Sequence, residues 1–154
     1  MFYTGSFRMR LFLVIFIFIA GTIAPVNPSR FFIRGTVKCQ DAPPWCYTIQ
    51  LLELDSAFND VLASLSACEL TNPNQEFLIE SWQPWDGPLD WHFELELSIK
   101  HDCGIEITEE KQSMKLSFGQ FYRLKPYFDK KVEIDFNKNT AKVIEIWDPK
   151  YWSD

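Results

Sequence analysis

Apolar and polar residues alternate along much of this chain, and this alternation limits the possible folds more than any other feature. The clearest case runs from Phe93 to Lys100, where Phe, Leu, Leu and Ile at the odd positions are separated by Glu, Glu, Ser and Lys. A period of two is typical of a β-strand with one face in a core and the other in solvent. We therefore expect the odd positions of this segment to point into a core.

The same pattern recurs in seven further segments, which are predicted to be strands: 33–39, 47–54, 61–68, 77–80, 114–118, 132–136 and 141–147. Clusters of Pro, Gly, Asn and Asp separate them, and Asn137 to Thr140 predicts a hairpin turn. Many short strands joined by turns favour an all-β, two-sheet β-sandwich of seven to eight strands. One segment departs from this pattern, because Ile105 to Ser113 fits a short helical turn.

The first 24 residues have the layout of a cleavable signal peptide. Arg8 and Arg10 precede the apolar run from Leu11 to Ala20, which is shorter than the ~20 residues that a transmembrane helix needs. We expect cleavage between Ala20 and Ala24, the alternative being an uncleaved signal anchor. No later apolar run predicts a membrane segment, so the sequence predicts a secreted, extracellular domain at 25–154.

The charge of the mature chain argues against a polyanionic partner. The whole sequence carries a net charge of −6, and loss of the two leader arginines changes it to −8. Nucleic-acid binding usually requires a dense basic face. The one local basic pair, Lys130 and Lys131, is flanked by Asp129 and Glu133. Nucleic acid is therefore not an expected partner.

Four cysteines lie in the predicted mature chain, at Cys39, Cys46, Cys68 and Cys103. An even number of cysteines in a secreted chain is typical of disulfides. A zinc site is the competing interpretation, but the chain has no CxxC motif and only two histidines, so the ligand spacing is poor. We expect two disulfides and neither a metal nor another cofactor.

Strand alternation also ranks the three possible disulfide pairings. Cys39 and Cys103 fall on the inner faces of the first and fifth predicted strands, whose ends meet if these strands run in parallel in opposite sheets. Cys46 and Cys68 fall on the outer faces of the second and third strands, which form an antiparallel hairpin. The predicted pairs are therefore Cys39 with Cys103 and Cys46 with Cys68.

Several segments also carry a family resemblance. They are an opening strand with a glycine and a cysteine (IRGTVKC, 33–39), a second strand with acidic residues at its end (YTIQLLELD, 47–55), the segments 60–62 and 74–77, and a strand ending in His-Asp-Cys (LSIKHDC, 97–103). Over roughly residues 31–103, and more weakly to Phe136, the chain resembles the transthyretin-like family of secreted nematode proteins.

The resemblance implies a transthyretin-like (prealbumin or immunoglobulin-like) sandwich, which accommodates a short helix after the fifth strand. The chain departs from the family pattern at Gln75, which stands where the family has a turn glycine. Cys46 and Cys68 are additional, and a cysteine often found shortly after the His-Asp-Cys motif is missing.

His101, Asp102 and Cys103 have the residue types of a nucleophilic triad. Adjacent residues of a strand point to opposite faces, however, so they are not expected to converge on one substrate atom. Glu94 and Glu96 share a face, as a catalytic carboxylate pair does, but a solvated outer face explains them more simply. No catalytic residue is predicted.

The wider fold suggests an alternative function, a hydrolase of the transthyretin-related (hydroxyisourate hydrolase) type. Those enzymes use several histidines, an arginine and a C-terminal Tyr-Arg-Gly-Ser. This chain has two histidines and ends in Tyr151-Trp152-Ser153-Asp154, so an enzyme is not the preferred interpretation. Transport of a hydrophobic hormone in a tetramer channel is likewise not indicated by any motif.

The remaining suggestive feature is the segment Trp82 to Trp91, in which Trp82, Trp85 and Trp91 flank Pro, Gly and Asp residues. Exposed aromatic side chains in a loop commonly mark a contact surface. The alternative places Trp82 and Trp91 in the core and exposes only Trp85. The preferred function is an extracellular binding or interaction module on a disulfide-braced sandwich, its partner being a protein, a lipid or a small hydrophobic ligand.

Overall fold

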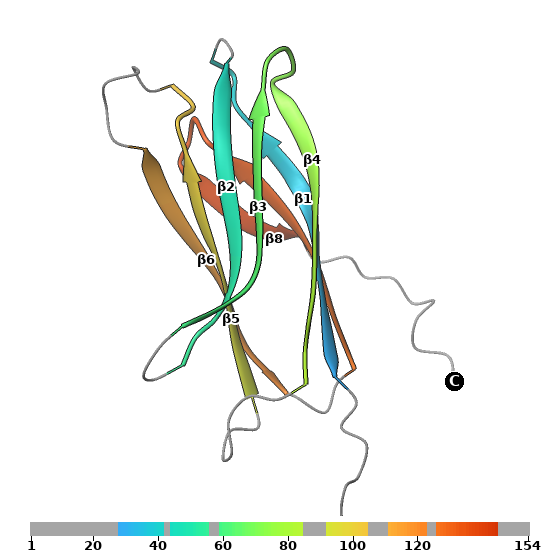
Figure 1. The fold of residues 1–154 in the computed structure, drawn as a ribbon. Helices are drawn as coiled ribbons and strands as arrows, with labels where there is room; N and C mark the ends of the chain where they lie inside the picture. Colours follow the sequence, from blue (N-terminus) through green and yellow to red (C-terminus); the bar gives the residue numbers. More distant parts are fainter. Residues whose placement is uncertain are drawn as a thin grey trace, which may run out of the picture.

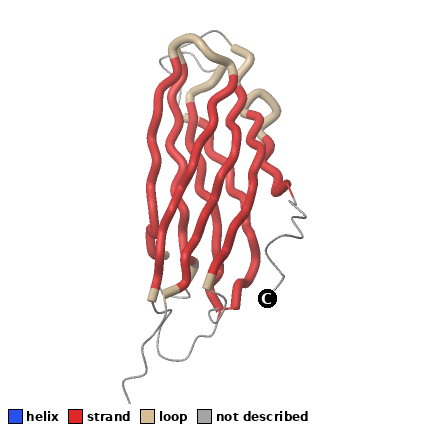
Figure 2. The backbone as a smooth tube through the Cα atoms, turned by 90° about the vertical axis from the view of Figure 1, so that its right-hand side faces the viewer, coloured by secondary structure: helices blue, strands red, loops and turns tan. Residues whose placement is uncertain are grey.

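The computed structural model describes residues 28–41, 44–55, 59–84, 92–104, 111–122 and 126–144. Within these ranges the chain forms strands and no helix (Figures 1 and 2). The strands are β1 (Ser29–Lys38), β2 (Trp45–Glu53), β3 (Asp60–Glu69), β4 (Asn74–Gln83), β5 (His92–His101), β6 (Gln112–Tyr122), β7 (Tyr127–Asp135) and β8 (Thr140–Ile144). The prediction of an all-β sandwich of seven to eight strands is confirmed.

Two local predictions fall partly or wholly outside these ranges. The signal peptide and its cleavage sites precede residue 28, so they are not described. Residues 105–110 of the predicted helical turn are also outside, while Gln112 and Ser113 begin β6 instead. The described residues contain no helix that could span a membrane.

The strands form two four-stranded sheets, ordered β4-β1-β7-β8 and β3-β2-β5-β6. All pairings are antiparallel except that of β1 with β7. In Figure 1, β1 and β5 run in the same direction in opposite layers, as the disulfide prediction requires. The predicted hairpin across residues 137–140 joins β7 to β8, and Asn139 takes the left-handed conformation there, with a φ of 50°.

The core lies between the inner faces of the two sheets. The odd positions of β5, from Phe93 to Ile99, are at most 1% exposed, as the alternation predicts. Gly35 of β1 lies where the neighbouring strands β7 and β4 leave no room for a side chain. A Cβ atom at this position would lie 2.2 Å from the Val132 carbonyl oxygen and 2.9 Å from the Phe77 ring, so only glycine fits without a backbone shift.

The structure contains both predicted disulfides. Cys39 is bonded to Cys103 with a Cα–Cα distance of 6.0 Å, and this buried bridge joins the end of β1 to the turn after β5 in the other sheet. Cys46 is bonded to Cys68 with a Cα–Cα distance of 4.0 Å, and the two are direct register partners on β2 and β3. One bridge therefore joins the sheets and the other joins neighbouring strands.

Candidate functional site

The outer face of the β4-β1-β7-β8 sheet carries large side chains that are open to solvent. Leu78 and Trp82 of β4 are 53% and 63% exposed, and Tyr127 of β7 is 62% exposed. Phe32 of β1 lies between them and contacts Tyr127, with a ring-centroid distance of 6.5 Å. Strand alternation places these residues outward because their neighbours, Phe77, Ile79 and Phe31 among them, fill the core.

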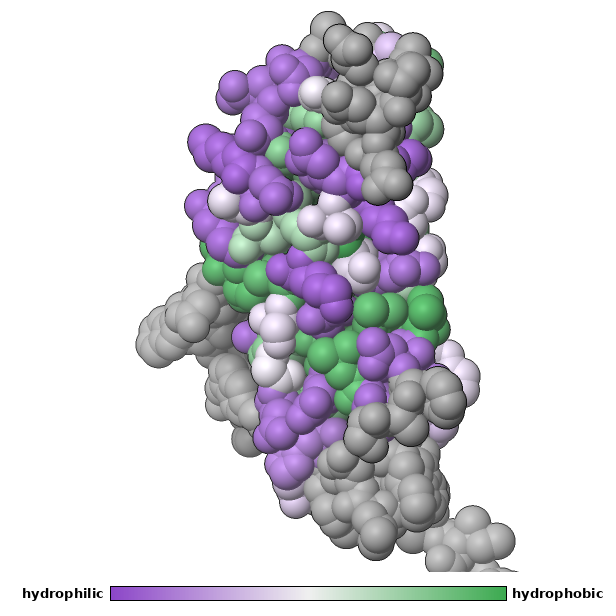
Figure 3. All heavy atoms as spheres, turned by 90° about the vertical axis from the view of Figure 1, so that its left-hand side faces the viewer, coloured by the Kyte–Doolittle hydropathy of each residue, from purple (hydrophilic) through white to green (hydrophobic). Residues whose placement is uncertain are grey.

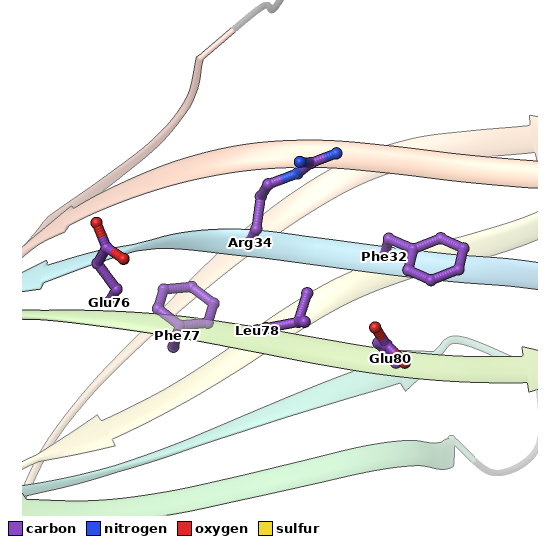
Figure 4. A pocket seen from close by; sticks show the side chains of 6 residues that line it. All are labelled: Phe32, Arg34, Glu76, Phe77, Leu78 and Glu80. Carbon is purple, nitrogen blue, oxygen red and sulfur yellow. The ribbon is translucent and has the colours of Figure 1, made fainter.

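Two adjoining hollows of about 460 and 540 Å³ lie on this face. They share Phe32 and Glu80; the first is also lined by Arg34, Glu76, Phe77 and Leu78, and the second by Pro28, Arg30, Ser81 and Trp82. Figure 4 shows that the residues of the first come from two neighbouring strands, β1 and β4. We call these hollows with Leu78 and Trp82 the β4–β1 surface.

The charges of this sheet are distributed unevenly. On the β1 and β7 side, Arg34 Nε donates to Asp129 Oδ1 at 3.2 Å, and Glu133 lies 2.8 Å from Lys142 Nζ and also contacts Lys38. These two lysines lower the pKa of Glu133 to about 2, and the hydrogen bond from Lys142 has the larger effect.

On β4 the arrangement differs, because Glu76 and Glu80 form no ion pair within the described part of the chain. The acidic side chains of β4 are thus available to an external cation, whereas those of β7 are already neutralised.

The predicted tryptophan loop is only partly described. Trp82 belongs to β4, opposite Arg30 of β1, and the alternative that buries it in the core is wrong because its side chain points to the outer face. Trp85 and Trp91 lie outside the described residues. Leu78 and Tyr127 were missed as site residues; the extended alternation of β4 could have identified Leu78, since it places positions 78, 80 and 82 on one face.

His101, Asp102 and Cys103 do not form a catalytic triad. His101 is fully buried and stacks on Phe136, with ring centroids 4.1 Å apart. Asp102 points the other way and accepts a hydrogen bond from the Cys46 amide at 2.5 Å, and Cys103 is consumed by its disulfide. The adjacent-residue argument is therefore confirmed for His101 and Asp102, while the disulfide removes Cys103 as a nucleophile.

His101 is part of a buried aromatic cluster with Trp45, Tyr47 and Phe136. Burial lowers the pKa of His101, and the nearby Asp102 opposes this only in part. Burial likewise raises the pKa of Tyr47. Neutral side chains are favoured here, so the cluster packs as core.

The paired glutamates of β5 differ from expectation. Glu94 is exposed and accepts a hydrogen bond from the Gln120 amide at 2.8 Å. Glu96 is only 8% exposed and lies 2.9 Å from Lys115 Nζ. The prediction of a solvated face is wrong for Glu96, because β2 and β6 flank it on both sides and the pairing with β6 shifts register at this residue.

Potential metal ligands gather at two places in the described residues. Cys39 and Cys103 lie near Asp41, but their sulfurs are joined in a disulfide and are not free to bind a metal. The carboxylate oxygens of Glu53, Asp55 and Asp60 lie within 4.8 Å of one another, and Glu53 already accepts a hydrogen bond from the Glu94 amide at 3.3 Å. Three carboxylates would suit a hard cation such as Ca²⁺.

The opposite side of the molecule, where β6 lies, is shown in Figure 3. Hydrophobic residues gather across its middle and are interrupted by hydrophilic ones. On β6 the apolar side chains, Met114, Leu116 and Phe118, are partly buried and pack against the core. The exposed apolar atoms of β6 therefore belong mainly to side chains that pack against the core, whereas the side chains of Leu78 and Trp82 point away from the core.

Comparison with known proteins gives one match to report. An uncharacterized protein of Caenorhabditis elegans is 36% identical to this chain over 75 residues, which are 49% of this chain and 56% of that protein. The match thus spans about half of each chain. No family model matches the chain, and no solved structure matches it.

Proposed function

We propose that this chain is a secreted member of the transthyretin-like family that works as an extracellular protein-binding module, with its binding site on the β4–β1 surface. The observation that carries the proposal is the exposure of Leu78 and Trp82 beside two hollows on the outer face of the β4-β1-β7-β8 sheet. Large apolar side chains are usually turned inward, and a group of them on one strand face commonly marks an interaction site.

The two disulfides support secretion, since such bonds persist in oxidising compartments. They also support a binding role, because the bridge from Cys39 to Cys103 anchors β1, one of the two strands of the β4–β1 surface, to the other sheet before a partner arrives. Preorganisation of this kind improves affinity by reducing the entropy lost on binding.

The surroundings of the hollows favour a protein partner over a lipid. Glu76, Glu80, Arg30 and Arg34 interrupt the apolar side chains, and protein interfaces combine aromatic residues with such polar groups. A membrane-facing surface would require a continuous apolar area.

The proposal is tested by quantitative co-purification from extracellular fluid, using the wild-type protein and a Leu78→Ala/Trp82→Ala variant. Tyr122→Ala is the matched control, because Tyr122 is an exposed aromatic residue on the other sheet. We expect the double variant to lose at least nine-tenths of a partner that the control retains, since truncating an anchoring aromatic costs roughly 2 kcal/mol or more. Equal recovery with all three proteins would contradict the assignment of this surface.

A further inference from the structure

The four edge strands of the sandwich differ in how well they are protected against pairing with another strand. Unpaired backbone groups of an edge strand form a template for a further strand, and proteins protect edges with bulges, lysines, prolines or short lengths. The edges here are β4 and β8 in one sheet and β3 and β6 in the other.

Three of these edges carry such protection. β3 contains a bulge, because Leu51 pairs with Ala63 and Leu52 with Val61, so that Leu62 is an additional residue. β6 contains another at Phe118 and Gly119, where Gly119 has a φ of 72°. β8 is only five residues long and carries a lysine. Each of these features interrupts the regular row of backbone groups that a further strand would need.

β4 has none of these features. Its ten residues pair with β1 without a register shift, and its sequence, NQEFLIESWQ, contains no lysine, arginine or proline. The Ser81 hydroxyl donates to the Leu62 carbonyl of β3 at 2.8 Å, which fixes the strand against the other sheet. β4 is therefore a long, regular and open edge, and its outward side chains line the β4–β1 surface.

The side chains of β4 indicate which strand could pair with it. Its outward positions include Glu76 and Glu80 on either side of Leu78, and the neighbouring edge strand β3 adds Asp60 and Glu69 and no basic residue. If β4 paired with its own copy in an antiparallel register centred on Leu78, Glu76 would lie opposite Glu80 of the second copy. Like charges directly opposite one another destabilise a strand pair, so this register with a second copy is disfavoured, whereas a basic strand is favoured.

We propose that the partner presents an extended segment with lysine or arginine at alternate positions, which adds to β4 as a fifth strand of the β4-β1-β7-β8 sheet. Backbone hydrogen bonds to the open edge would supply affinity, and alternate basic side chains would contact Glu76 and Glu80. This inference rests on the proposed function, since it names the kind of partner that the β4–β1 surface accepts.

The test uses two short synthetic peptides, in which valine alternates with either lysine or glutamate, and measures their affinities by fluorescence polarisation at low salt. We expect the wild-type protein to bind the lysine peptide about tenfold more tightly than the glutamate peptide, from two cross-strand charge pairs. A Glu76→Lys/Glu80→Lys variant should reverse this preference. The control, Glu94→Lys/Gln112→Lys/Gln120→Lys, makes the same change in net charge at exposed residues of β5 and β6, away from β4, and should retain the wild-type preference.

Amide hydrogen exchange then locates the peptide. Strand addition should slow exchange at alternate amides of β4 and leave those of β6 and β8 unchanged. Equal affinities for the two peptides, an equal response of both variants, or binding without protection of β4 would each overturn strand addition. If the protein alone dimerises and β4 becomes protected without peptide, the partner of β4 is a second copy of this chain and not a basic strand, which overturns the proposal. If strand addition fails while Leu78→Ala/Trp82→Ala still loses a partner, the proposed function survives without this inference.

Discussion

Removal of the disulfide between the sheets should destabilise this protein more than removal of the disulfide within the β2–β3 hairpin. The relevant variants are Cys39→Ala/Cys103→Ala and Cys46→Ala/Cys68→Ala. The first bridge spans 64 residues of sequence and the second spans 22. Chain entropy alone makes these bridges worth about 4.3 and about 3.4 kcal/mol.

Burial adds to the difference. Cys39 and Cys103 are 0% and 3% exposed, so truncation leaves a small cavity in the core that costs roughly a further 1 kcal/mol. Cys68 is exposed and Cys46 is half-buried, so their truncation leaves little unfilled space. We therefore expect the first variant to be less stable than the second by about 2 kcal/mol.

The assay is thermal unfolding of both oxidised variants at neutral pH, followed by circular dichroism. A difference of about 2 kcal/mol corresponds to roughly 8 °C in Tm for a domain of this size. If the Cys39→Ala/Cys103→Ala variant melts at or above the Tm of the Cys46→Ala/Cys68→Ala variant, the conclusion that the disulfide between the sheets contributes more stability is refuted.

Three further predictions concern stability. Burial lowers the pKa of His101, so the unfolded chain takes up a proton at this residue at a higher pH than the folded chain does. The free energy of unfolding should therefore not depend on His101 above pH 6.5, and it should fall by about 1.4 kcal/mol per pH unit between pH 6.5 and the folded pKa. His101→Phe should remove this pH dependence in urea titrations. Gly35→Ala should cost about 3 kcal/mol in the same titrations, since its Cβ would overlap the Val132 carbonyl; unchanged stability would contradict the close strand approach. Glu133, whose pKa is lowered to about 2, contributes stability that is present above pH 4.5 and lost as the pH falls toward 2. Glu133→Gln should therefore reduce the loss of stability between pH 4.5 and pH 2, and an unchanged loss would contradict its pairing with Lys142.

Much of the fold could be predicted from local sequence because the strands bury one face each. The odd positions of β5 and the faces of the four cysteines follow from a period of two, and the two disulfides follow from those faces. Bulges do not follow in this way. An additional residue such as Leu62 reverses the alternation of inward and outward side chains, but it can be recognised only once the register with the partner strand is known. Val61, which belongs to a predicted strand, is consequently exposed.

The candidate site depended on information that alternation lacks. Trp82 stood out by its residue type, but its position beside Phe32 and Glu80 is set by the pairing of β4 with β1. Whether a strand lies at an edge is likewise a property of sheet order. Only the assembled sheets distinguish the open edge of β4 from the protected edges of β3, β6 and β8.

The most direct test of the binding site is site-specific photo-crosslinking in extracellular fluid. A benzophenone side chain is placed at Leu78, on the β4–β1 surface, and in a second protein at Tyr122, which is exposed on the other sheet. We predict a discrete crosslinked partner from position 78 that is absent from position 122 and is lost when Trp82→Ala is added. The same crosslinked products from both positions, or none from position 78, would contradict the account.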